Sequence, residues 1–482
     1  RAQDGPENPE QADTIYVIMP GILAGAGSLE PTARNIVRAA TQTGRHVEVW
    51  ALDRRSNCLE DHTGIAAAAQ AKDATVAFNY YFAGQPIDGH TYAGPASPAD
   101  AAFLNDVGLA QTVQDYHAVL AQLPAQVRQQ KVMCGGHSLG GPIVGALANW
   151  DFDGTPGYTL CAGYFTLDSR LSMGTGAPAG LTELQSVLPV GVADLFAGLR
   201  AGSPYINMPP LSPATFAMLG VLTQAAALAP DERSAVLSRI PHDLNFEVAL
   251  RLFGARDWVA ALSGTPDLRQ LNATNAAVLG IVLDDNSSPI SILRGSFGAP
   301  TGGPVVAKSF PLPYGAPSAG VVGGNKLVSP SDPQALYRWL NYDQLPPAGP
   351  TTTDGDHYTT PASEVTDVHQ LAAAFGAPSA DGTEWYFPIR LLTDLTAIQL
   401  GDRHGSLANL KYDGISKRPA IYLDAGDSGL ETGMGVPAGS TQVVLPGYNH
   451  IDVGTAAWKQ NNGQPEPLSH ALVDFVASHI AR

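Results

Sequence analysis

The sequence predicts an α/β fold: a mostly parallel sheet, flanked by helices and interrupted by a large insertion. Three observations support this. Strand and helix signals alternate over about the first third of the chain, a similar pattern returns near the C-terminus, and the long segment between them has a different character. Alternation of this kind places the strands parallel and covers them with the connecting helices.

The elements follow from apolar, β-branched runs and from helical spacing. In the N-terminal part we predict strands over 13–23, 46–52, 131–135 and 162–167, and helices over 31–43, 101–123 and 139–150. The segment that follows residue 52 is interpreted as a polar stretch with Gly and Pro. Near the C-terminus we predict strands over 418–425 and 441–445 and a closing helix over 467–480. Each group has too few strands for a complete sheet, so we expect them to form one sheet together.

The domain organisation follows from this division. We predict a flexible N-terminal tail over 1–12, a core over 13–171 and 416–482, and an inserted cap over 172–415. The insertion holds Ala/Leu-rich helical stretches over 181–199, 213–229 and 245–262, and then Gly- and Pro-rich segments. Such an insertion lies above the carboxyl ends of the strands, where an open α/β sheet binds its ligand. The alternative is a second, independent domain.

Composition and charge exclude several classes of protein. With 44% hydrophobic and 15% charged residues in a chain of 482, a disordered chain and a charge-rich coiled coil are both excluded. The formal net charge of −17 would repel phosphate backbones, so we expect no nucleic-acid partner. No apolar run is long enough for a transmembrane segment. The polar tail after Arg1 is typical of a chain from which a signal peptide has been removed, which predicts a secreted or periplasmic protein, although a trimmed chain would look the same.

The cysteines predict neither a metal centre nor a redox motif. Cys58, Cys134 and Cys161 allow at most one disulfide and one free thiol. Cys134 and Cys161 lie in apolar, strand-like segments and are interpreted as small buried hydrophobic residues. Without a Cys-x-x-Cys motif or a Cys/His cluster we predict no zinc site, and we expect no other cofactor.

The strongest chemical signal is the pentapeptide Gly136-His137-Ser138-Leu139-Gly140, which follows a predicted strand and precedes a predicted helix. In a G-x-S-x-G elbow the serine lies on a tight strand-to-helix turn, and the glycines avoid backbone clashes. We therefore predict Ser138 as a nucleophile, with the N–H of Leu139 as one donor to an oxyanion. His137 is expected to point away from the serine and pack.

A serine nucleophile needs a base and an acid. His450 follows the last predicted strand and precedes the closing helix, so we predict it as the general base. For the acid we prefer Asp427, in the loop after the strand over 418–425. Asp168, at the end of the strand over 162–167, is the alternative, because such triads are defined by geometry and not by sequence position.

The second oxyanion donor is expected in the turn after the first strand. Pro20 has no N–H and Gly21 allows close approach, so the N–H of Ile22 is the predicted donor. We expect a charged loop near the site to be held by ion pairs among Arg54, Arg55, Glu60 and Asp61.

Several short motifs resemble those of acid lipases in the α/β-hydrolase superfamily. Pro20–Leu23 is similar to their His-Gly-Leu-Leu turn, Val49–Asn57 to their Val-Trp strand with Arg-Gly-Asn, and Tyr448–Asp452 to their Tyr-Asn-His-Leu-Asp. Gly-His-Ser-Leu-Gly is a common lipase pentapeptide. The departures are Pro20, where His is usual, and a glycine at the usual position of the acid. The insertion is not matched.

The resemblance implies an α/β-hydrolase fold and a serine hydrolase that acts on carboxylic esters. It supports Ser138, His450 and Ile22 as site residues. The apolar insertion favours a small-molecule ester or lactone with a hydrophobic surface. Two alternatives are an amidase or peptidase with the same triad and an inactive binding protein on the same fold. The oligomeric state is not predicted.

Overall fold

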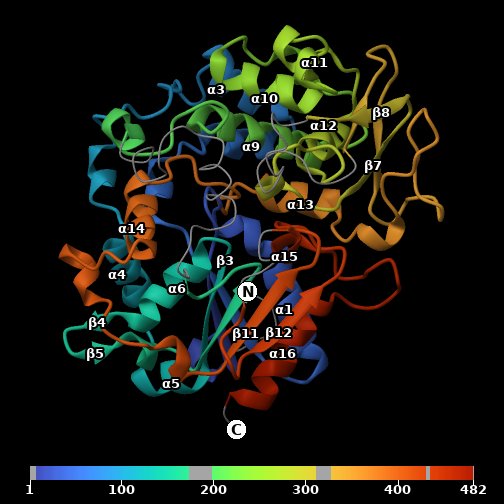
Figure 1. Cartoon of the computed structure of the whole chain (residues 1–482). Coiled ribbons are helices and arrows are strands. Elements are labelled where there is room, and N and C mark those ends of the chain that lie inside the picture. Colours follow the sequence, from blue (N-terminus) through green and yellow to red (C-terminus); the bar gives the residue numbers. More distant parts are fainter. Residues whose placement is uncertain (1–6, 173–197, 311–326, 430–434, 481–482) are drawn as a thin grey trace.

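A six-stranded parallel sheet forms the lower half of the molecule in the view of Figure 1. The computed structural model describes residues 7–172, 198–310, 327–429 and 435–480. The strands lie in the order β12-β11-β6-β3-β1-β2, and every neighbouring pair is parallel. Their bounds are β1 (Thr14–Met19), β2 (Val47–Ala51), β3 (Val132–His137), β6 (Gly163–Leu167), β11 (Ala420–Ala425) and β12 (Thr441–Leu445). The predicted parallel sheet is confirmed.

The two groups of strands join at the pair β6 and β11, which are far apart in the chain. Thr166 of β6 lies opposite Tyr422 of β11 in register. Among the described residues, nothing between these strands adds a strand to this sheet. Because parallel strands end at one edge, the residues that follow β3, β6 and β12 meet there.

Helices cover both faces of the sheet. Tyr16 and Ile18 pack in a cluster with α1 (Glu30–Gln42) and α16 (Pro467–His479). Ile15 and Val17 point to the opposite face, with α4 (Leu109–Leu120) and α6 (Gly140–Asn149). Successive side chains alternate between faces, so a strand covered on both sides is apolar throughout. This explains why the first strand has a continuous apolar run. Smaller elements here are α5 (Ala125–Lys131), α15 (Asp452–Thr455), β4 (Asp151–Phe152) and β5 (Thr155–Pro156).

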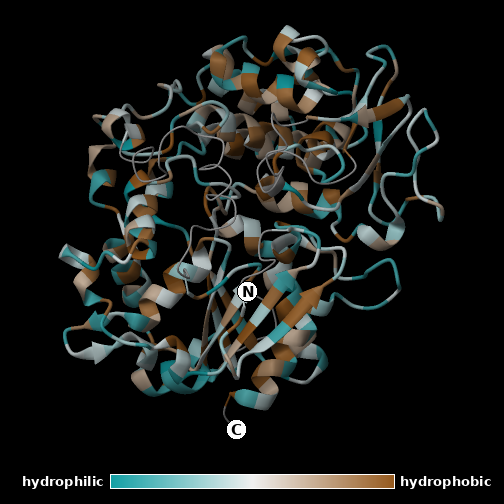
Figure 2. Ribbon diagram, viewed as in Figure 1, coloured by the Kyte–Doolittle hydropathy of each residue, from teal (hydrophilic) through white to brown (hydrophobic). Residues whose placement is uncertain are grey.

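Most of the insertion forms a second layer, above the sheet in Figure 1, whereas α14 (Ile389–Gln399) packs beside α4. The other helices of the insertion are α9 (Pro213–Leu228), α10 (Leu244–Gly254), α11 (Trp258–Ser263), α12 (Asn275–Leu283) and α13 (Val368–Phe375). Two antiparallel pairs join β7 (Gly298–Thr301) with β10 (Arg338–Asn341) and β8 (Val305–Lys308) with β9 (Leu327–Pro330). Figure 2 shows many hydrophobic residues on the helices of this layer, mixed with polar ones. None of the described helices is long and apolar enough to cross a membrane.

Of the helices expected in the insertion, one is divided into two in the structure. Another falls almost wholly outside the described residues. The stretch 245–262 is two helices, because α10 ends at Gly254 and Asp257 caps α11 by accepting a hydrogen bond from the N–H of Ala260. The helix expected over 181–199 lies almost wholly outside the described residues.

Two helices that the sequence analysis did not predict lie in the second layer. They are α2 (Thr63–Ala71) and α3 (Ala74–Ala83), and both pack against α9. One continuous hydrophobic cluster includes Val17 of the sheet, Phe78 of α3 and Val221 of α9. The two layers therefore share a core among the described residues, while the division into core and cap stays a prediction.

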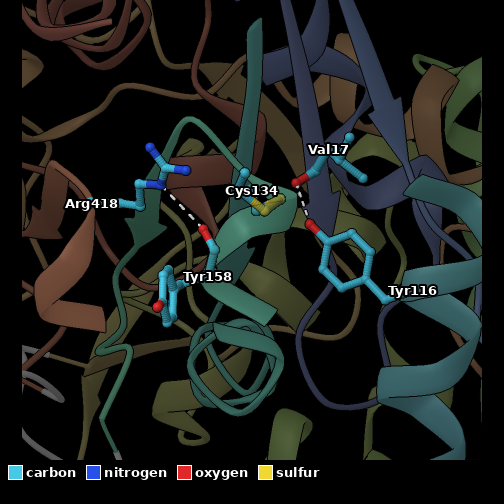
Figure 3. The surroundings of a disulfide bond; sticks show 6 residues. Val17, Tyr116, Cys134, Tyr158 and Arg418 are labelled. Atoms are coloured by element: carbon cyan, nitrogen blue, oxygen red, sulfur yellow. Dashed lines mark hydrogen bonds between the residues drawn. A yellow bond between two sulfur atoms is a disulfide. The ribbon is translucent and has the colours of Figure 1, made fainter. Parts of the chain in front are cut away.

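A disulfide joins Cys134 of β3 to Cys161, just before β6 (Figure 3). The two Cα atoms are 5.9 Å apart and both residues are fully buried. Beside it, the hydroxyl of Tyr116 donates to the carbonyl of Val17 at 2.7 Å. The interpretation of these two cysteines as simple hydrophobic residues is therefore wrong. Cys58 is a free, exposed cysteine.

Candidate active site

Ser138 lies on the predicted elbow between β3 and α6. Its backbone has φ +51°, a conformation that non-glycine residues rarely adopt and that is typical of strained functional turns. A Cβ added at Gly136 would lie 2.1 Å from the carbonyl carbon of Gly140, and one at Gly140 would lie 2.1 Å from the carbonyl oxygen of Met19. Only glycine fits at either position. The turn therefore presents Ser138 at the edge of the sheet, beside the N-terminus of α6.

His450 is paired with Asp168. The Nδ1 atom of His450 lies 2.6 Å from Oδ2 of Asp168, and both side chains are buried. The other carboxylate oxygen accepts hydrogen bonds from the N–H of Ala425 at 3.1 Å and the hydroxyl of Ser428 at 3.3 Å. A carboxylate accepts, so Nδ1 of His450 carries the proton and Nε2 is left as the basic nitrogen.

The preference for Asp427 as the partner of His450 is therefore wrong. Asp427 follows β11, where its N–H donates to the carbonyl of Tyr448 at 2.9 Å. Burial raises the pKa of its carboxyl group. Asp168 is better placed because β6 is the direct neighbour of β3, and the N–H of Ser138 donates to the carbonyl of Leu167 at 3.1 Å. The end of β6 thus brings Asp168 close to the elbow.

His137 packs against His450. Its Nε2 lies 3.0 Å from the carbonyl oxygen of His450, and the two ring centroids are 4.8 Å apart. Because a carbonyl only accepts, His137 donates from Nε2. Burial and the neighbouring His450 lower the pKa of His137 to about 3. A neutral His137 therefore links the elbow to the loop that carries His450.

Asp452 fixes the loop of His450. One carboxylate oxygen accepts from the N–H of Asn449 at 2.7 Å, and the other from the hydroxyl of Thr366 at 2.6 Å and the N–H of Ser296 at 3.0 Å. Burial raises the pKa of Asp452 to about 6. Two of these three donors belong to the insertion, so the second layer helps to position His450.

The turn after β1 lies directly over Ser138. A Cβ added at Gly21 would lie 2.9 Å from Cβ and 3.5 Å from Oγ of Ser138. The next residue, Ile22, is half-buried, as is Leu139. Within the described part of the chain, no protein acceptor takes the N–H of Ile22 or of Leu139. Neither N–H group is therefore occupied by an acceptor among the described residues.

Arg54 holds this turn from behind. Its guanidinium donates to the carbonyls of Pro20 at 3.0 Å, Gly21 at 2.6 Å and Ala24 at 3.1 Å. Its Nε donates to Glu384 at 2.8 Å, and both side chains are almost fully buried.

The expected ion pairs of Arg54 and Arg55 with Glu60 and Asp61 are therefore wrong. Arg54 pairs with Glu384 and Arg55 pairs with Asp115. Glu384 is 330 positions from Arg54, and no local pattern marks it in the sequence. It could be identified only once the insertion had been placed against the turn.

The six parallel strands, the flanking helices and the strand-elbow-helix at Ser138 define an α/β-hydrolase fold. No family model matches the chain, and no curated protein gives a significant match. One similar solved structure is described as a "putative lipase" from Sulfolobus solfataricus. It shares 13% sequence identity, the match covers 97% of this chain and 86% of that chain, and the TM-score is 0.45. The assignment of the site residues therefore depends only on the geometry of this chain.

Proposed function

We propose that this chain is a serine hydrolase that cleaves carboxylic esters of a fairly hydrophobic small molecule. One observation carries the proposal. The buried pair of His450 and Asp168, 2.6 Å apart, lies at the same sheet edge as the strained elbow of Ser138. A nucleophile, a base and an orienting carboxylate are the parts that covalent acyl transfer needs.

In the proposed mechanism, Oγ of Ser138 attacks the ester carbonyl while Nε2 of His450 accepts its proton. Asp168 stabilises the imidazolium, and the N–H groups of Ile22 and Leu139 bind the oxyanion. When the tetrahedral intermediate collapses, the alcohol leaves with the proton from His450 and the acyl group stays on Ser138. Water then gives a proton to His450 and attacks the acyl carbon, and the acid is released as Ser138 regains its proton.

The residues beside Ser138 support a hydrophobic substrate. Ile22 and Leu139 are both apolar and only half-buried. A site bordered by apolar side chains gains binding energy by removing an apolar surface from water. The proposed substrate class is therefore a lipid ester, a lactone or a polyketide-like ester.

We further propose that the protein works in an oxidising compartment, secreted or periplasmic. The disulfide between Cys134 and Cys161 supports this, because such bonds persist mainly outside the reducing cytosol. Thiol titration of the denatured protein should find one thiol after export to an oxidising compartment. Three thiols in exported, active protein would contradict the proposal.

The function is tested with a panel of p-nitrophenyl esters of graded acyl length, bulky lactones and matched anilides. We expect ester turnover that exceeds amide turnover, and loss of more than about a hundredfold in kcat for Ser138→Ala. Ser478→Ala, an exposed serine on α16, serves as the matched control and should keep full activity. Faster turnover of anilides would indicate an amidase. A folded protein with no turnover would favour a binding protein.

A further inference from the structure

Three side chains that could ligate a metal meet behind the turn that covers Ser138. Glu60 and His62 come from the loop before α2, and Asp381 comes from the segment between α13 and α14. Nε2 of His62 lies 3.0 Å from Oδ1 of Asp381 and 3.6 Å from Oε2 of Glu60. The three ligand atoms all lie within 4.8 Å of one another.

The spacing suits a small divalent cation. Zinc binds nitrogen and carboxylate oxygen at about 2.0–2.2 Å in a tetrahedron, which places neighbouring ligand atoms about 3.3 Å apart. The distances from His62 to Asp381 and to Glu60 lie on either side of that value. A neutral imidazole and two carboxylates also balance the charge of the ion.

Glu60 provides an independent sign of a ligand. Its side chain has no exposed surface, and its Oε1 accepts from the N–H of Trp385 at 2.8 Å. Its Oε2 faces His62 and accepts no hydrogen bond from the described residues. A buried carboxylate oxygen without a donor is costly, and a bound cation removes that cost.

A hydrogen bond from Asn57 orients one of the other two groups, the carboxylate of Asp381. Nδ2 of Asn57 donates to Oδ2 of Asp381 at 3.0 Å, which leaves Oδ1 facing His62. Hydrogen bonds of this kind fix the ligands in protein metal sites. The side chain of His62 is 35% exposed, so an ion can enter and a water can complete its coordination.

A second group of carboxylates, Asp284, Asp285 and Glu364, is less suitable. It contains no histidine. Asp284 already accepts from two backbone N–H groups, and Glu364 accepts from the N–H of Gly298 and the hydroxyl of Thr359. These acceptors are satisfied without an ion.

We propose that Glu60, His62 and Asp381 bind a divalent transition-metal ion of the zinc class as a structural site. The carbonyl of Asp381 accepts from the N–H of Gly27 at 2.7 Å, and the N–H of Glu384 donates to the carbonyl of Leu23 at 2.9 Å. The ion therefore fixes a segment that pairs with the turn over Ser138. Metal binding itself does not depend on the proposed hydrolase function, whereas an effect on turnover does.

The first test measures zinc directly. The full chain, without an affinity tag, is stripped with a chelator and titrated with Zn²⁺ against a chromogenic chelator. We expect one tightly bound ion per chain and a thermal midpoint that rises by several degrees when it binds. Bound Co²⁺ should show the intense visible absorption of a four-coordinate site. No bound zinc at about 10 μM free ion, with no shift of the midpoint, would overturn the proposal.

Substitutions of the proposed ligands test which residues bind the ion. Glu60→Gln and His62→Gln should each lower zinc affinity at least about tenfold. His242→Gln is the matched control, because His242 also contacts a carboxylate, Glu247, at 3.0 Å but is 79% exposed and is in no such three-ligand group among the described residues. Equal affinity in all three variants would refute the assignment. If a variant fails to fold, the titration of the wild type with Zn²⁺ and Co²⁺ still decides whether a site exists.

The outcomes separate this site from the proposed function. Zinc binding without any labelling of Ser138 by a fluorophosphonate would contradict the hydrolase and leave the metal site intact. Labelling of Ser138 without zinc binding would support the hydrolase and contradict the metal site. The metal-free alternative is a protonated His62 bonded to Asp381, and it predicts no response to chelators.

Discussion

Oδ2 of Asp168 lies 2.6 Å from Nδ1 of His450, so the carboxylate that orients this imidazole comes from the end of β6. The pair joins two segments separated by 282 positions in the chain. Its stability depends on the strand order, because β6 lies between β3, which carries the serine elbow, and β11, whose Ala425 donates to Asp168.

Asp168→Asn should lower kcat by up to about ten-thousandfold while the fold is kept. An Asn at this position cannot stabilise the imidazolium and favours the wrong tautomer of His450. Asp427→Asn is the matched control and should change kcat by less than about threefold, since the side chain of Asp427 accepts from the N–H of Gly447, a bond that the Oδ1 of Asn can also accept. Both values come from steady-state turnover of the best ester. Strong loss in Asp427→Asn with normal activity in Asp168→Asn would reverse the assignment.

Gly21→Ala should strongly reduce kcat/KM. The added Cβ would lie 2.9 Å from Cβ of Ser138, so the turn or the serine must move. Gly220→Ala, on α9, is the control, because its Cβ would make only an ordinary contact with Ile65 at 3.5 Å. That change should leave activity intact and slightly stabilise the helix. Normal turnover in Gly21→Ala would show that the turn does not border the reacting atoms.

His137 should make the protein acid-sensitive. Its pKa is lowered from 6.5 to about 3 in the fold, so below pH 6.5 the unfolded chain binds the extra proton and the folded chain does not. The contribution of His137 to the free energy of unfolding therefore has its full value above pH 6.5. It decreases progressively as the pH falls towards 3. His137→Gln keeps a donor for the carbonyl of His450 and does not titrate.

The measurement is the urea unfolding free energy of both proteins at pH 8 and pH 5. Relative to His137→Gln, the wild type should lose about 2 kcal/mol between these values, at about 1.4 kcal/mol per pH unit below 6.5. An equal pH response of the two proteins would mean that His137 is charged in the fold.

The disulfide should stabilise the chain around the elbow. It joins two cysteines separated by 27 positions and so closes a loop that contains Ser138, for which the chain-entropy model gives about 3–4 kcal/mol. Cys134→Ala/Cys161→Ala should therefore unfold at lower urea concentration than the wild type. A reductant present during unfolding should lower the midpoint of the wild type and leave that of the double variant unchanged. Unchanged midpoints in all cases would mean that the bond contributes nothing to stability.

Sequence alone could predict the features with a local signature. The glycines around Ser138 mark the elbow, and the place of His450 between the last strand and the closing helix marks it as a site residue. The sheet strands were predictable because apolar, β-branched runs bounded by turns stand out in the chain. The helices α2 and α3 were missed because their apolar residues form no clear helical face. In α3 in particular, apolar residues lie around most of the circumference.

Other features depend on which segments meet in space. The choice between Asp168 and Asp427 requires the strand order, which composition and periodicity do not contain. Glu384 and Asp381 belong to the insertion, and their partners Arg54 and His62 lie more than 300 positions earlier. The proposed metal ligands show no short Cys/His spacing for the same reason, and the disulfide depends on β3 and β6 being neighbours.

The most direct test of the central claim is covalent labelling with a fluorophosphonate, followed by intact-mass measurement and peptide mapping. We expect one adduct per chain on Ser138 in the wild type and in Asp427→Asn. We expect much slower labelling in His450→Ala and Asp168→Asn, and none in Ser138→Ala. An adduct that persists in folded Ser138→Ala, or no adduct on the folded wild type, would contradict the claim.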